Sequence, residues 1–158
     1  MKLYRIIDRL PLPDVVEMVN LQKVTNAQVA RLNREKNKQS IQNYFFWIGL
    51  ACYHYGVMAG KRGAGTQKGA GKMMTIPEAK AYRRKALQLV DIVEYQDAET
   101  PVEAHIALHT IRDRELREYR ETKDVAGFLF MLSYYSYHLG RIMGKREERA
   151  RRKNGKKQ

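Results

Sequence analysis

The side chains best suited to binding chemistry in this sequence are basic and aromatic ones near the C-terminus. Tyr134, His138, Arg141 and Lys145 recur at intervals of three or four residues, which places them within about 60° on one side of a helix. Arginine and lysine pair with phosphates, and tyrosine stacks on bases or packs on sugars. The pattern therefore indicates a nucleic-acid ligand. The alternative is that Tyr134 and His138 belong to the core and only Arg141 extends to the surface.

Two segments carry the other candidate phosphate contacts. Residues 60–85 hold eight basic and one acidic side chain, and residues 145–158 hold eight basic and two acidic ones, which together equal the net charge of +13. Clustered positive charge is the usual footprint of a phosphate-rich partner, and less often of an anionic membrane or an acidic protein. We expect DNA or RNA backbone contacts from Lys61, Arg62, Lys68, Lys72, Arg83, Arg84, Lys145, Arg146, Arg149, Arg151 and Arg152.

The glycine-rich stretch at 60–74 resembles a phosphate-binding loop at first sight. A P-loop requires Gly-Lys followed by Ser or Thr, but Gly71-Lys72 is followed by Met73, and no strand pattern precedes it. The motif therefore fails as a catalytic phosphate cradle. We expect a mobile basic loop that follows a nucleic-acid backbone, with a solvated linker as the alternative.

Nothing else in the sequence has the setting of a catalytic or metal site. His105 and His109 have the i, i+4 spacing of metal ligands, but no HExxH motif accompanies them, and we interpret them as half-buried or surface side chains. Cys52, the single cysteine, has Ser136 as its counterpart in a repeat, which indicates a small packing residue rather than a reactive thiol. We expect no catalytic residue, no metal and no cofactor.

An internal repeat positions these residues. Residues 43–62 and 127–146 align without a gap at an offset of 84, and each copy ends in Gly-Lys-Arg. Small residues recur in both copies at i, i+3, i+7 and i+11, a spacing that gives a helix a flat seam for close approach. The two stripes are Gly49, Cys52, Gly56 and Gly60, and Ser133, Ser136, Gly140 and Gly144.

Capping signals divide the chain into helices. Thr25, Thr75 and Thr100 each begin a Thr-x-x-Glu/Gln pattern, which predicts helices from about residues 26, 76 and 101. Ser40 and Asp124, again 84 apart, are plausible N-caps of the two repeat helices. We therefore expect helical hairpins at about 26–61 and 101–150, unless each break is a bend in one long helix. The predicted fold is an all-α bundle of four to six helices, with two related hairpins packed through small-residue seams.

The length of the chain suits one helical domain over 1–158, with a basic tail at 147–158. The uncharged run at 44–60 is shorter than the ~20 residues of a membrane span and contains three tyrosines and a histidine. We expect a buried helix there, no membrane association and a cytoplasmic location. The sequence leaves the oligomeric state open.

The endings YHYGVMAGKR and YHLGRIMGKREERARRKNG resemble the Tyr-x-x-Gly-x-x-x-Gly-Lys-Arg endings of small basic proteins from phages and integrative elements of Firmicutes. The resemblance covers about a quarter of the chain and implies a mobile-element protein, with no functional residue to carry over. We expect a non-enzymatic nucleic-acid-binding (DNA-binding) protein. The alternative is a protein-interaction inhibitor of a host defence complex such as a CRISPR–Cas effector, an anti-CRISPR-like nucleoprotein partner.

Overall fold

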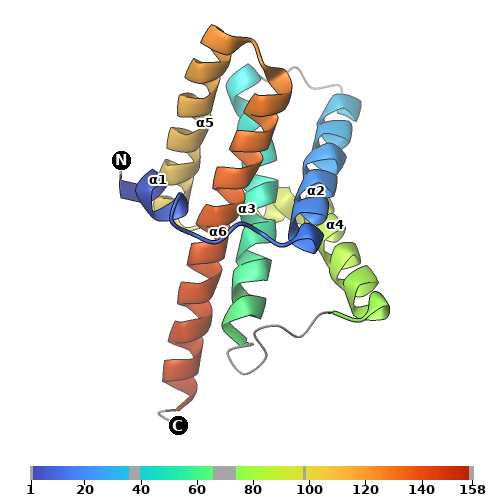
Figure 1. Ribbon diagram of the computed structural model, residues 1–158, viewed down its shortest axis with the longest axis vertical. Helices are drawn as coiled ribbons and strands as arrows, with labels where there is room; N and C mark the ends of the chain where they lie inside the picture. The colour runs from blue at the N-terminus through green and yellow to red at the C-terminus, as the bar shows by residue number, and fades with distance from the viewer. Residues whose placement is uncertain (1, 36–39, 66–73, 98, 157–158) are drawn as a thin grey trace.

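Two long helices at the centre of the molecule organise the fold. The computed structural model describes residues 2–35, 40–65, 74–97 and 99–156, and every regular element in these ranges is an α-helix. The helices are α1 (Lys2–Ile7), α2 (Val15–Arg34), α3 (Ile41–Gly65), α4 (Ile76–Asp97), α5 (Val102–Thr122) and α6 (Val125–Gly155). α3 and α6 lie side by side and run in the same direction, while α2 and α5 run opposite to them (Figure 1). The predicted all-α bundle with two related hairpins is confirmed.

The contact between α3 and α6 is built from the repeated small residues. A methyl group added at Gly56 would lie 2.0 Å from the carbonyl oxygen of Tyr137, and one at Gly140 would lie 1.9 Å from that of Tyr53. The contact recurs one turn further along, with Gly60 against Arg141 and Gly144 against Val57. Each contact thus has a counterpart 84 residues away, which is the pattern of an approximate two-fold axis between the hairpins. The predicted close seam is confirmed.

The second helix of each hairpin begins at a side-chain cap. The Gly127 amide donates to Asp124 Oδ1 at 3.0 Å, and the Asn43 amide donates to Ser40 Oγ at 3.2 Å. Lys123, before Asp124, has a left-handed backbone with φ of 56°, so α5 and α6 are separate helices rather than one bent helix. The caps predicted at Ser40 and Asp124 are therefore confirmed.

Of the three predicted helix starts, those near residues 76 and 101 are confirmed, and the one near residue 26 is wrong. Thr75 and Glu78 form the reciprocal capping box, with the Thr75 amide donating to Glu78 Oε2 at 2.8 Å. Thr25 lies inside α2, where its buried hydroxyl donates to the Leu21 carbonyl at 2.9 Å. Thr100 is also buried and bonds to a histidine side chain across the bundle instead of capping α5, whose N-cap is Pro101. The helix start predicted at Thr25 is wrong because its hydroxyl bonds to buried groups, the Leu21 carbonyl and the Ser133 hydroxyl, in the interior of the bundle.

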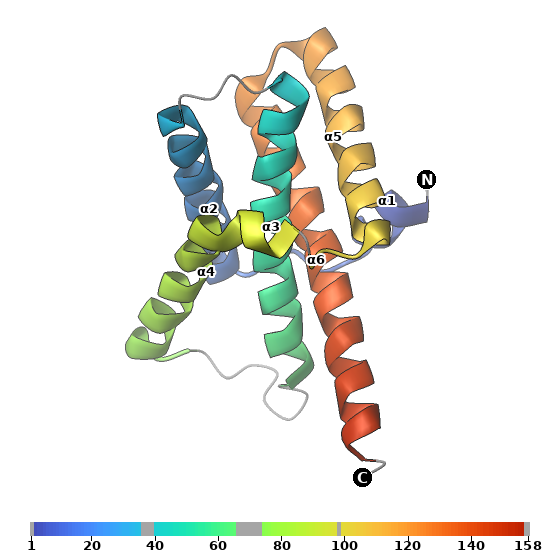
Figure 2. The ribbon, with the colours of Figure 1, turned by 180° about the vertical axis from the view of Figure 1, so that it is seen from behind.

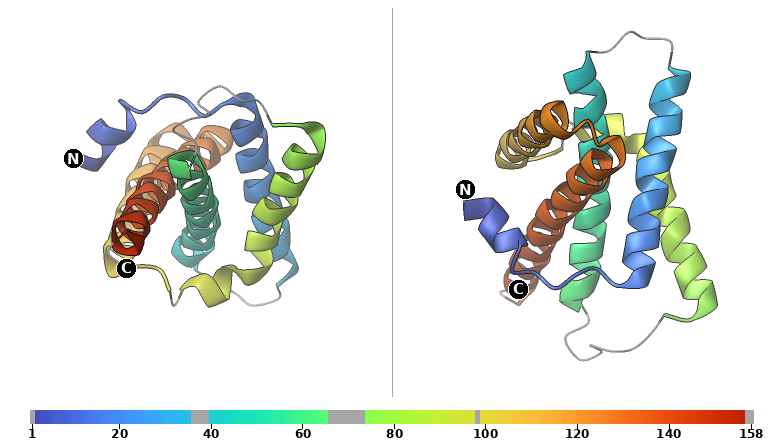
Figure 3. Two further views of the ribbon diagram at one scale, coloured as in Figure 1. Left: turned by 90° about the horizontal axis from the view of Figure 1, so that it is seen from below. Right: turned by 45° about the horizontal axis from the view of Figure 1, so that its top comes forward.

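The remaining helices cover the central pair. α4 packs across α2 and α3 on one side, and α1 packs against α6 on the other (Figures 2 and 3). The Tyr4 ring of α1 meets the Tyr135 ring of α6 edge-on, with 4.6 Å between their centroids. Within the described part of the chain, no helix combines the length and apolarity that crossing a membrane requires.

Candidate functional site

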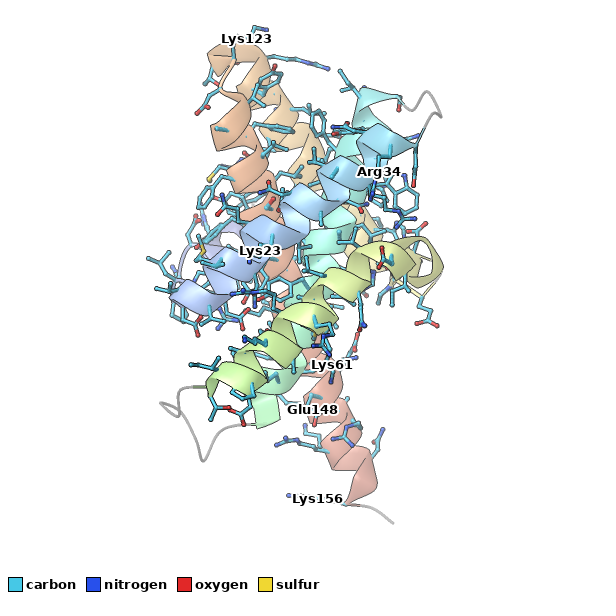
Figure 4. The ribbon with its side chains drawn as sticks, turned by 90° about the vertical axis from the view of Figure 1, so that its right-hand side faces the viewer. Lys23, Arg34, Lys61, Lys123, Glu148 and Lys156 are labelled. Carbon is cyan, nitrogen blue, oxygen red and sulfur yellow. The ribbon has the colours of Figure 1, made fainter. Side chains whose placement is uncertain are left out.

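Basic side chains from three helices gather at one end of the bundle. α3 ends, α4 begins and α6 extends there, and Figure 4 shows Lys61 and Lys156 at this end, with Lys123 and Arg34 toward the opposite one. We call this region the basic end; its described cations are Lys61, Arg62, Lys80, Arg83, Arg84, Lys85, Arg141, Lys145, Arg146, Arg149, Arg151, Arg152, Lys153 and Lys156. Hence charges that are far apart in the sequence reinforce one another in space.

The strongest feature of the basic end is a row of three cations along α6. Arg141, Lys145 and Arg149 follow one another at four-residue intervals, so their side chains share one side of the helix. Burial lowers the pKa of the half-buried Lys145, and the positive charges of Arg141 and Arg149 lower it further. Among the described residues, no salt bridge joins any of the three to a carboxylate. We call these residues the α6 row.

Other cations of the basic end are held in ion pairs. Lys61 Nζ lies 2.7 Å from Glu147 Oε2, which links the end of α3 to α6. Arg151 and Arg152 both donate to Glu148, at 2.7 and 3.0 Å, and these hydrogen bonds lower the pKa of Glu148 to about 2. The cations of these pairs are exposed, although the Glu148 side chain is only 12% exposed, so the pairs fix their positions more than they stabilise the fold.

A cluster around Glu17 uses two of the predicted phosphate contacts. The hydroxyl of Tyr82 donates to Glu17 Oε1 at 2.8 Å, and Tyr55 also donates to this carboxylate. The Arg62 guanidinium lies 4.6 Å from the Tyr82 ring centroid. Arg83 Nε donates to Asn20 Oδ1 at 3.2 Å. Arg62 and Arg83 therefore help to join α4 to α2 and α3, while Arg84 and Arg146 stay exposed.

One residue of the predicted basic and aromatic face, His138, is buried in the core. His138 is 0% exposed, burial lowers its pKa to about 4, and neither ring nitrogen has a hydrogen-bond partner among the described residues. Tyr134 is half-buried, with its ring edge-on to His138 at 4.4 Å. α1 and the linker after it run across α6 in this region, where the Tyr135 hydroxyl donates to Asp8 Oδ1 at 3.3 Å (Figure 1). The face thus loses His138, while Tyr134, Arg141 and Lys145 are each partly exposed.

Part of the stretch predicted as a loop is helical. Residues 60–65 continue α3 rather than forming a loop, because the backbone of Gly60 packs directly against α6. Lys68 and Lys72 lie outside the described residues. At the other end of the site, α6 continues to Gly155, so most of the predicted tail is helical. Lys156, the C-cap residue of α6, was not among the predicted contacts.

The histidine pair and the cysteine have structural settings. His105 and His109 stack on the Phe46 ring, with centroids 5.6 and 4.4 Å away, and His105 Nε2 lies 3.0 Å from Asp97 Oδ1. Within the described ranges, no three side chains of the His, Cys, Asp or Glu type come together as a metal site would require. Cys52 is buried and 3.3 Å from the Thr25 hydroxyl, and burial raises the pKa of its thiol, which disfavours the reactive thiolate.

An apolar groove lies between α2 and the first half of α6. Its volume is about 450 Å³, and its walls include Met18, Val19, Leu129 and Phe130. Phe130 is 50% exposed, whereas its counterpart in the first repeat, Phe46, is covered by the two histidines. The repeats therefore diverge here as well, since one groove is filled and the other open.

The chain matches no protein-family model, no curated protein and no solved structure.

Proposed function

We propose that the protein binds nucleic acid through its phosphate backbone at the basic end, without enzymatic activity. The observation that supports this most is the α6 row. Three like charges four residues apart repel one another, and the pKa of Lys145, which burial lowers, is lowered further by Arg141 and Arg149. A row of phosphates would relieve this repulsion, and releasing the counterions of the nucleic acid would drive binding.

The other cations of the basic end would surround this row. Arg84 and Arg146 are exposed and extend the charged surface onto α4 and around α6. Lys61, Arg151 and Arg152 would contribute while still held by Glu147 and Glu148, which sets their positions but reduces their net charge. We retain Lys68 and Lys72 as proposed contacts on the strength of the sequence.

The setting of this function is also a proposal. The resemblance of the two helix endings to small basic proteins of phages and integrative elements supports a role in a mobile element. A nucleic-acid ligand supports a cytoplasmic location. The mode of binding implies little preference for base sequence, because phosphate contacts position a protein without reading bases.

Removing the α6 row tests the proposal. The variant Arg141→Gln/Lys145→Gln/Arg149→Gln should bind a short duplex at least about tenfold more weakly than the unmodified protein in about 50 mM salt. Arg117→Gln/Arg120→Gln/Lys123→Gln is the matched control, since it removes the same charge from the opposite end of the bundle. Negligible affinity of the unmodified protein for both DNA and RNA would show that the proposal is wrong.

The open groove favours a second candidate, an inhibitor that binds a host nucleic-acid-targeting complex. Phe130 would anchor a protein partner there, since half-exposed aromatic side chains beside apolar grooves are typical of interfaces. The basic end would then occupy the partner's nucleic-acid groove. The test is capture of a nuclease by the purified protein. Capture that persists after all nucleic acid has been digested, and that is lost in the Phe130→Ala variant, would support this candidate. Capture that depends on nucleic acid would contradict it.

A further inference from the structure

The end of α6 projects past the rest of the described bundle. α3 is described to Gly65, whose counterpart in the repeat is Arg149, so residues 150–155 have no helical equivalent in the described part of the first hairpin. Six residues extend a helix by about 9 Å. Residues 149–156 are all exposed, and Figure 4 shows this helix end standing clear of α3 and α4, with Lys156 at its tip. We call residues 149–156 the projecting end.

Cations surround the projecting end instead of lining one side. Arg149 and Arg151 are two residues apart, which places them about 200° apart around the axis. The side chain of Arg151 is 75% exposed and that of Arg152 is 45% exposed. A flat surface or a single strand would contact one flank of such a helix, whereas a groove between two phosphate backbones would contact both.

The basic end offers no ring on which an unpaired base could stack. The sequence contains no Phe, Trp, Tyr or His at 56–81 or at 139–158. Tyr82, which lies between these segments in space, is 8% exposed and is covered by Arg62. Proteins that bind single strands use aromatic stacking together with a charged groove. The charge is present here, and the stacking platform is absent from the described part of the basic end.

The dimensions of the projecting end match one groove in particular. A helix with its side chains is about 10–12 Å across, and the major groove of B-form DNA is about 12 Å wide and 8.5 Å deep. The major groove of an A-form RNA duplex is too narrow and deep to admit side chains. Arg152 and Lys153 also place positive charge in the last turn of α6, where it offsets the negative end of the helix dipole.

Building on the proposed function, we infer that the ligand is double-stranded B-form DNA and that the projecting end of α6 enters its major groove. Arg149 and Arg151 contact the phosphates of opposite strands. The α6 row continues along one backbone, and Lys61 lies at the groove edge. The fit is one of shape and charge, so it applies to duplex DNA of any sequence.

Three probes of one sequence test the inference: a DNA duplex, an RNA duplex and a single DNA strand. The full chain should bind the DNA duplex at least about tenfold more tightly than either other probe in about 100 mM salt. Bound protein should also protect guanine N7, a major-groove atom, from dimethyl sulfate, but leave the minor-groove atom adenine N3 reactive. Arg149→Gln/Arg151→Gln should remove the protection, while Arg117→Gln/Arg120→Gln on α5 should retain it.

The outcomes separate this inference from the proposed function. Equal affinity for the three probes, or protection at adenine N3 without guanine N7, would overturn the major-groove inference and leave phosphate-backbone binding intact. Absence of binding to every probe at low salt would overturn both. Because Arg149 and Arg151 are exposed, the double variant should melt at the same temperature as the unmodified protein. An unchanged melting temperature would show that the loss of protection is not caused by unfolding.

Discussion

Gly56 and Gly140 are the residues on which the packing of the two repeats depends. Glycine normally weakens a helix by about 0.5–1 kcal/mol relative to alanine, because it is more flexible in the unfolded chain. Here the space for a Cβ atom is already occupied by the backbone oxygens of Tyr137 and Tyr53, at 2.0 and 1.9 Å. A backbone oxygen moves only if a whole helix moves. Replacing either glycine with alanine should therefore lower the free energy of unfolding instead of raising it.

Gly56→Ala and Gly140→Ala should therefore each lower the free energy of unfolding by about 1–3 kcal/mol, the range for overpacking. Gly63→Ala is the control within the same helix, since its added methyl would lie 3.9 Å from the nearest atom, Lys145 Cε. That variant should be neutral or slightly stabilising. Urea unfolding measures all three, and equal stability of Gly56→Ala and Gly63→Ala would contradict the close seam.

His138 is an ionisable side chain sealed into the core next to the α6 row. Its pKa is about 4 in the folded protein, against 6.5 for an ordinary histidine, because burial and the charges of Arg141 and Lys145 disfavour the imidazolium. Between these values the unfolded chain binds more protons than the folded one, so this residue removes stability as the pH falls from 6.5 toward 4. His54, with a pKa also near 4, acts in the same direction.

His138→Phe should consequently lose less stability than the unmodified protein between about pH 7 and pH 5. The substitution also removes two buried nitrogens that lack partners among the described residues, and it replaces a ring with one of similar shape. Urea midpoints at the two pH values give the comparison. A parallel fall in both proteins would show that His138 is not held neutral by burial.

Glu115 acts in the opposite direction. Burial, followed by the neighbouring Glu118, raises its pKa from 4.5 to about 7. The folded protein then binds the extra proton between these values, so the contribution of Glu115 to stability is full below pH 4.5 and is lost as the pH rises through 7.

Glu115→Gln imitates the protonated form, so it should stabilise the protein at about pH 8 and lose this advantage at about pH 5. Thermal melting at the two values measures the difference. Glu121→Gln on the exposed end of the same helix controls for removing a negative charge. An advantage that is equal at both values would contradict a buried carboxyl with a raised pKa.

At the scale of helices, the sequence predicted what depends on local chemistry and regular spacing. The caps at Ser40, Thr75 and Asp124 involve groups within a few residues of each other, and the small-residue seam recurs at an offset of 84. Thr25 and Thr100 show the same local motif, but their hydroxyls bond to groups on other helices. A single-sequence pattern contains no information about those distant partners.

The projecting end of α6 should be dispensable for folding, because its residues are exposed and follow the last close contact with α3. A chain that ends after Glu148 should keep the melting temperature of the full protein within about 2–4 °C, as expected when little surface is buried. It should nevertheless lose most of its affinity for a DNA duplex. A large fall in melting temperature would show that this segment supports the core.

At the scale of the molecule, the charge distribution was only partly predictable. The sequence indicated which segments are basic, and the fold brings the end of α3, the start of α4 and the second half of α6 to one end (Figure 1). The sequence could not indicate all the cations that are paired with carboxylates, because some of these pairs join different helices in the fold, as Lys61 and Glu147 do. His138, an expected contact, is likewise a core residue, packed against Tyr134 and Tyr137.

The salt dependence of binding tests the central claim, that a phosphate backbone binds at the basic end, most directly. For a DNA duplex, the logarithm of the association constant should fall with the logarithm of salt concentration with a slope of about −4.5 or steeper, corresponding to about five or more phosphates. In Arg141→Gln/Lys145→Gln/Arg149→Gln the slope should become shallower by about 3, while the control triple variant on the opposite end should keep the slope of the unmodified protein. A slope near zero, or equal slopes in the unmodified protein and the α6-row variant, would contradict the account.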